Sequence, residues 1–167
     1  MSGTIVPFER DVLAHLEAQI DSARRLLGSI LGQGVAIRER DVESVLARLA
    51  DIKTEMDLRA SLESERTDLL VRAGAQLGVP AAAVTLEAMT SLMTPLVAER
   101  ARERSAELRG LLDEVSREHG INRALMRQEL AFLDHLVRLL SKEPDTGYRP
   151  TGPSAPTASH HVLNLQA

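Results

Sequence analysis

The chain has 167 residues, of which 44% are hydrophobic, so it is long enough to bury one core of ordinary size. Only 2% of the residues are aromatic, 26% are charged, and the net charge is −4. Such a chain has neither a basic stripe for phosphates nor a set of aromatic platforms for bases, which argues against nucleic acid as a partner.

Cysteine is absent, which excludes disulfides, thiolate metal sites and a cysteine nucleophile and fits a cytoplasmic protein. The first residues lack the basic region and apolar run of a secretion signal. No apolar run reaches the roughly 18 residues that predict a membrane-spanning helix. We therefore expect a chain that does not cross a membrane.

The first predicted helix covers about residues 8–31. Its apolar residues recur at alternating steps of three and four, which is typical of a coiled-coil seam. The two glycines of Gly32-Gln33-Gly34 are predicted to end the helix, because they favour open or left-handed backbone. The seam consists of Leu13, Leu16, Ile20, Ala23, Leu27 and Ile30.

A second helix is predicted over about residues 41–77, with Asp41 as its N-cap and Gly78 at its end. Its first half repeats the same spacing, which predicts a packed stripe. Charged residues four positions apart predict two ion pairs within the helix, Glu55 with Arg59 and Asp68 with Arg72. The stripe consists of Val42, Val45, Leu49, Ile52 and Met56.

A short helical connector is predicted at about residues 85–93, with Thr85 as N-cap. Thr94-Pro95 then marks the start of a last helix over about residues 95–142, because proline is favoured at the first helical position. Apolar residues recur every seven positions both before and after Gly120, without a shift between the two parts. This regular spacing favours one continuous helix. The alternative, in which Gly120 closes one helix and Asn122 caps another, stays open.

The second half of this last helix has an unusually wide apolar face. The face covers nearly half of the helix, against the roughly 100° that a single core stripe requires. A central helix that contacts two neighbours would show this pattern. A face that receives an apolar helix from a partner would show it equally well. Asn122 lies within the face, where it either fixes register or partner choice or bonds to water or a neighbouring helix.

No residue pattern points to catalysis or to a metal. His160 and His161 are adjacent and lack further ligands nearby, and neither Glu118-His119 nor Asp134-His135 has the Glu-x-x-His spacing of carboxylate-bridged metal sites. The carboxylates alternate with arginine on polar faces, as solvated helices do. We expect no enzymatic activity, no cofactor and no metal.

These elements predict an all-α protein, an antiparallel bundle of long helices with coiled-coil-like packing. The bundle domain would cover residues 1–143. Residues 144–167 are rich in proline and polar residues and include the only tyrosine, Tyr148, so we expect a flexible tail there.

The order of these elements resembles the FlgN-type flagellar export chaperones. Residues 46–53 and 62–70 resemble the second helix of that family, and residues 122–133, which begin with Asn122-Arg-Ala-Leu125, resemble its last helix. Tyr148, followed by Gly152, matches a tyrosine and glycine in the family's tail.

The resemblance implies a cytoplasmic chaperone that masks the C-terminal helical segments of hook-associated proteins and delivers them to the export gate. It implies no cofactor, and we expect a monomer or a weak homo-oligomer. Tyr148 would dock at the gate. The alternative function is a self-associating coiled-coil structural or adaptor module. The candidate partner-binding residues in the helix are Ile121, Asn122, Leu125, Phe132, Leu133, Leu136 and Leu140.

Overall fold

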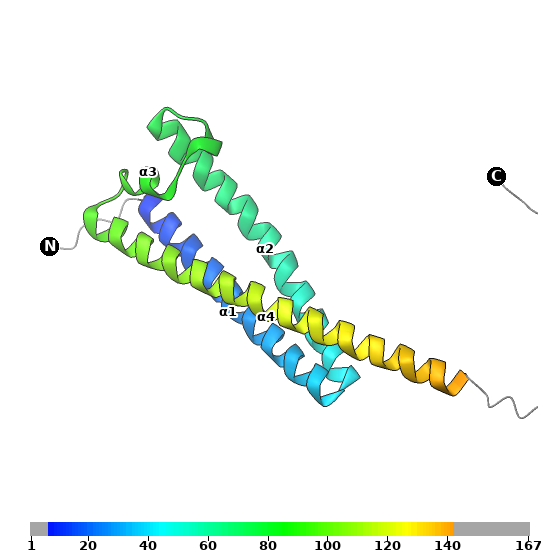
Figure 1. Ribbon diagram of the computed structural model, residues 1–167. Coiled ribbons are helices and arrows are strands. Elements are labelled where there is room, and N and C mark those ends of the chain that lie inside the picture. Colours follow the sequence, from blue (N-terminus) through cyan, green and yellow to red (C-terminus); the bar gives the residue numbers. More distant parts are fainter. Residues whose placement is uncertain (1–6, 142–167) are drawn as a thin grey trace, which may run out of the picture.

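A computed structural model of the chain describes residues 7–141, which form helices and connecting turns without any strand (Figure 1). The all-α fold class is therefore confirmed. None of the helices in this range is both long and apolar enough to cross a membrane. The elements in chain order are α1 (Pro7–Glu39), α2 (Val42–Leu77), the 3-10 turn η1 (Ala81–Ala83), α3 (Leu86–Thr90) and α4 (Pro95–Ser141).

The three long helices alternate in direction, so α4 runs parallel to α1 and antiparallel to α2 (Figure 1). α1 packs against both α2 and α4, whereas α2 and α4 barely contact each other. α1 is accordingly the central helix of the bundle. It is also the helix with the most buried residues, which lie along its whole length from Phe8 to Ile37.

The hydrophobic core is densest at the end of the bundle where α2, α3 and the start of α1 meet. Most of the side chains there are aliphatic or sulfur-containing, as expected for a chain with few aromatic residues. Partly buried Leu16, Leu70, Val84, Leu92 and Met93 pack around this cluster. The buried members of the cluster are Phe8, Val12, Leu69, Ala73 and Met89.

The prediction that Gly32-Gln33-Gly34 ends the first helix is wrong, because α1 continues to Glu39. The chain reverses at Arg40, whose φ of 59° is left-handed. The Arg40 N–H donates to the Ile37 carbonyl at 3.1 Å, and the Asp41 N–H donates to the Ala36 carbonyl at 3.0 Å. These two bonds form a Schellman motif with arginine in the position that glycine usually takes.

The other helix boundaries agree closely with the sequence signals. Asp41 caps α2 by accepting the Ser44 backbone N–H at 3.1 Å, and Thr85 caps α3 by accepting the Ala88 N–H at 3.1 Å. α2 ends at Gly78, whose φ is 70°. α4 passes through Gly120 as one helix. The regular seven-residue spacing of its apolar residues on both sides of Gly120 favours this result.

The predicted ion pairs within the second helix are wrong, because one member of each pair, Glu55 and Arg72, pairs with α1 instead. Glu55 accepts from Arg25 at 2.6 Å and from Ser22 at 3.2 Å, and Arg72 donates to Asp11 at 2.8 Å. Tertiary partners on the central helix therefore replace partners one helical turn away. Arg59 is left without an ion-pair partner among the described residues.

Candidate partner-binding site

Asn122 is buried between α4 and α1 and fixes how the two helices sit against each other. Its side chain is 3% exposed. The Nδ2 donates to the Ile30 carbonyl at 2.7 Å and to the Gln33 Oε1 at 3.2 Å. The structure contains the expected bond to a neighbouring helix, and because both acceptors lie on α1, this bond also sets the register of α4 on α1. The NH2 group of its amide is thus bonded within the bundle, as expected for a buried donor.

Gly34 accounts for the close approach of α1 to Asn122. A Cβ atom at this position would lie 2.6 Å from the Asn122 Oδ1. The glycine therefore makes room for an amide of the facing helix and does not make a turn. This contact explains why a residue that usually weakens helices lies in the interior of α1.

Ion pairs on the flank of the bundle hold α4 along α1. Arg104 pairs with Glu17 at 2.7 Å, and Arg24 pairs with Glu107 at 2.5 Å. Arg104 also donates to Glu107 at 2.8 Å, and this bond lowers the pKa of the Glu107 carboxyl below its usual value. Exposed pairs of this kind stabilise little individually, but they support the register that Asn122 sets.

Arg40, at the turn between α1 and α2, contacts the C-terminal part of α4. Its Nε donates to the Glu129 Oε2 at 3.2 Å. Its guanidinium also lies 5.6 Å from the centre of the Phe132 ring, within the range of a cation–π contact. The left-handed backbone of Arg40 thus places one side chain against two residues of α4.

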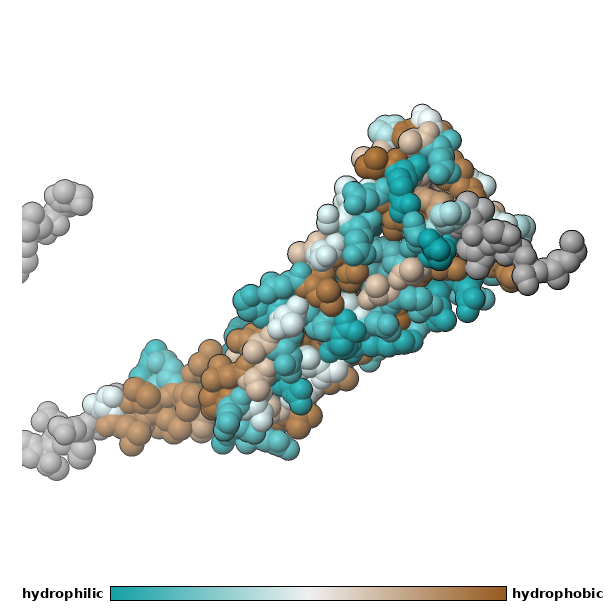
Figure 2. All heavy atoms as spheres, turned by 180° about the vertical axis from the view of Figure 1, so that it is seen from behind, coloured by the Kyte–Doolittle hydropathy of each residue, from teal (hydrophilic) through white to brown (hydrophobic). Residues whose placement is uncertain are grey.

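From about the position of these contacts to its end, α4 continues as a projecting segment, which we call the α4 arm (residues 131–141). Every residue of the α4 arm is exposed. The arm extends past the turn that joins α1 and α2 (Figure 1), and hydrophobic side chains gather on it (Figure 2). The exposed apolar residues of the arm are Phe132, Leu133, Leu136, Val137, Leu139 and Leu140.

The structure brings most of the sequence candidates to one end of the molecule. Leu133 is 54% exposed and Leu140 is 81% exposed, whereas Asn122 faces α1. Ile121 is exposed and Leu125 is half-buried at the base of the arm. Tyr148 lies outside the described residues. The apolar face is thus free along the arm and does not belong to a helix surrounded by neighbours.

A second set of exposed apolar side chains lies on the first half of α2. The heptad spacing of Val42, Leu49 and Met56 predicts a packed stripe, but these residues are 69%, 52% and 53% exposed. They are uncovered because α2 packs mainly on α1 and has no helix on its other side. Leu46, at 61%, extends the same surface and could have been recognised because it lies four positions after Val42 and three before Leu49.

No group of three or more metal-binding side chains gathers anywhere between residues 7 and 141. The site is instead an apolar surface bordered by charge, which suits the binding of a protein segment.

The family model described as FlgN protein matches residues 9–155. The chain belongs to the FlgN family. FlgN proteins are chaperones connected with the flagellum, and the matched range includes all of the α4 arm. Neither a curated protein nor a solved structure matches the chain.

Proposed function

We propose that this FlgN-family protein is a flagellar export chaperone of the cytoplasm that binds hook-associated proteins by their C-terminal helical segments. The observation that carries the proposal is the α4 arm. Monomeric proteins rarely leave such a continuous apolar surface uncovered unless a partner binds it. Family membership supports flagellar proteins as the partners.

The proposed mechanism is masking. An apolar client helix would lie along Leu133, Leu136 and Leu140 by the helix-in-groove mode, with its own apolar face turned away from water. Burying each large apolar side chain contributes about 1.5–3 kcal/mol before the costs of association are subtracted. A few such contacts would keep the client from aggregating and still permit its release. The mechanism needs no cofactor and no covalent step.

The base of the arm assists this role by stiffening it. Because Asn122 and Arg40 hold α4 as far as Phe132, the arm is presented as a helix that continues from a fixed one. A preorganised surface loses less conformational entropy when a partner binds.

Delivery would use the tail that follows the arm. We propose that Tyr148 contacts the export gate while the arm holds the client, which is the role that the family resemblance implies. Because the client-binding arm and the gate-binding tail are adjacent in the chain, contact with the gate would be coupled to release of the client.

A truncated chain that ends at Leu130 tests the client-binding role. This truncation removes the arm but keeps Asn122 and Glu129, so the bundle should fold. We expect it to lose binding to the C-terminal segment of a hook-associated protein. Undiminished affinity in the truncated chain would contradict the proposal.

The exposed arm also supports the alternative of a self-associating coiled-coil module. A second copy could cover the same apolar face. Light scattering on the full chain separates the two functions: a stable dimer or tetramer that ignores hook-associated proteins would favour the structural module, and a monomer that binds them would favour the chaperone.

A further inference from the structure

A second surface, separate from the α4 arm, lies where the three long helices face one another. We call it the α1–α2–α4 groove. It has a volume of about 380 Å³, with α1 as its floor and α2 and α4 as its walls. α3 and the segment before it close one end. Its lining is mostly apolar, and Leu16, Leu70, Leu108 and Leu112 are only half-buried there.

The length of the groove matches a helix that would lie along it with one face inside. Its lining residues on α2 run from Arg59 to Leu70, which corresponds to roughly 16 Å, or about three helical turns. α2 and α4 barely contact each other across it, since each packs on α1. A helix laid over α1 between them would complete a four-helix arrangement.

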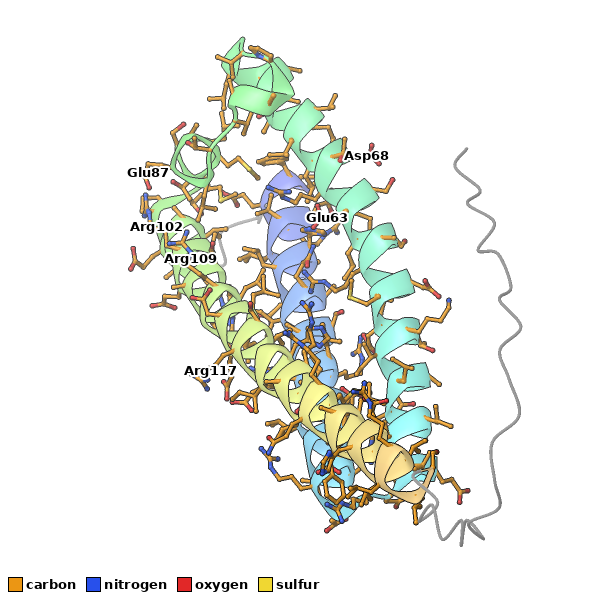
Figure 3. The ribbon with its side chains drawn as sticks, turned by 45° about the vertical axis from the view of Figure 1, so that its right-hand side comes forward. Glu63, Asp68, Glu87, Arg102, Arg109 and Arg117 are labelled. Carbon is orange, nitrogen blue, oxygen red and sulfur yellow. The ribbon has the colours of Figure 1, made fainter. Side chains whose placement is uncertain are left out.

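One charged group in the groove lacks a partner. The Arg59 Nη1 is buried and has no hydrogen-bond partner, and no carboxylate forms an ion pair with Arg59 among residues 7–141. Glu55 pairs with Arg25, and Glu63 accepts from Arg66 at 3.2 Å. Figure 3 shows Glu63 on the side of α2 that faces α1 and α4. Arg59 as a whole is half-buried, but a buried guanidinium nitrogen without an acceptor is unfavourable, so an acceptor from a partner would stabilise it.

We propose that the α1–α2–α4 groove binds an amphipathic helix of a partner protein that carries a glutamate or aspartate at the edge of its apolar face. The apolar face would cover the half-buried leucines of the groove. The carboxylate would accept from Arg59, in the planar geometry that guanidinium groups favour. This site is independent of the α4 arm, so the protein would hold two helical segments at once.

The test uses the full chain and synthetic amphipathic helical peptides that differ at one edge position, which is Glu, Gln or Lys. Binding is followed by fluorescence anisotropy. We expect the wild-type chain to prefer the Glu peptide over the Gln peptide by about tenfold or more, as a desolvated charge pair should. Arg59→Glu should reverse the preference toward the Lys peptide, and Arg59→Gln should remove it.

Arg109→Glu is the matched control, because it makes the same charge change on α4 outside the groove lining. Arg109 projects from the side of α4 away from α2 (Figure 3). This variant should keep the wild-type preference.

Equal binding of the three peptides to the wild-type chain would overturn the proposal, as would a preference that survives Arg59→Gln. A peptide affinity that is lost on removal of the α4 arm would assign the binding to the arm instead. Self-association that disappears in Arg59→Glu would mean that a second copy occupies the groove, and would overturn it as well.

Discussion

Asn122 of α4 and Gly34 of α1 fit against each other, since a Cβ atom at Gly34 would come within 2.6 Å of the Asn122 Oδ1. The amide cannot move away freely, because its Nδ2 is bonded to the Ile30 carbonyl at 2.7 Å and to the Gln33 side chain at 3.2 Å. A glycine and an amide, far apart in sequence, therefore set the position of α4 on the central helix.

Gly34→Ala should destabilise the fold by about 1–3 kcal/mol, because the added methyl group overpacks the contact with Asn122. Gly28→Ala is the matched control in the same helix. A Cβ there meets nothing within 4 Å, so alanine should stabilise the helix by about 0.5–1 kcal/mol. Urea denaturation of both variants measures the difference. Equal shifts for the two glycines would show that the contact with Asn122 does not matter.

Asn122→Ala should cost about 1–3 kcal/mol, since it removes two buried hydrogen bonds and leaves the Gln33 amide without its partner. The double variant with Gly34→Ala should be more stable than the sum of the single effects predicts, because the shortened side chain makes room for the methyl group. A double-mutant cycle by urea denaturation gives this coupling. Strict additivity would mean that the two residues do not act through one contact.

Acid should weaken the cap of α2. The Ser44 hydroxyl and backbone N–H donate to Asp41 and lower the pKa of its carboxyl below the usual value. A lowered pKa in the folded state means that the stabilisation is fully present above the unfolded value of about 3.9 and is lost as the pH falls through the folded pKa.

Asp41→Asn isolates this contribution, because asparagine also caps helices but does not titrate. The stability advantage of the wild-type chain over the variant should shrink between neutral pH and about pH 3. Denaturation at a series of pH values checks this. Other carboxylates with lowered pKa values, such as Glu87 beside Arg102, remain in both proteins and cancel in the comparison. An advantage that stays constant with pH would contradict the assignment.

Tyr148→Ala should leave the melting temperature and client affinity unchanged and should reduce export of hook-associated proteins. The expectation follows from the proposed separation between client binding on the arm and gate docking on the tail. Thermal melts, a binding assay and secretion measurements together check it. A clear fall in melting temperature would instead place this ring in the core.

Local signals in the sequence predicted the helices well, because caps, glycines and prolines act within a few residues. Asp41, Thr85 and Pro95 each mark a helix start where the structure has one. The prediction that the first helix ends at Gly34 was wrong because glycine occurs both in turns and where two helices pack closely. Only the position of Asn122 in the structure shows that Gly34 belongs to the second case. Arg40, a non-glycine residue in left-handed backbone, gave no turn signal at all.

The exposed apolar surfaces of α4 and α2 could be predicted only in part, because their exposure depends on distant parts of the chain. Heptad spacing shows that a helix face is apolar but not whether another helix covers it. Leu133 and Leu140 on the arm and Met56 on α2 are exposed because neighbouring helices end or diverge. Likewise Arg59 lacks its expected partner because Glu55 accepts hydrogen bonds from Arg25 and Ser22 on α1 instead.

The most direct test of the α4 arm as the client site is calorimetric titration of the full chain with the C-terminal helical segment of a hook-associated protein. The variant Leu133→Asp/Leu140→Asp places charge on the arm, and the control Val71→Asp/Leu96→Asp places it elsewhere. The control is matched in exposure, since Val71 and Leu96 are 55% and 82% exposed against 54% and 81% for the arm pair.

All three proteins should melt alike, because none of the four side chains is buried. We expect the arm variant to bind the client about tenfold or more weakly than the wild-type chain, and the control to bind like the wild-type chain. An arm variant that keeps the wild-type affinity would contradict client binding by the α4 arm.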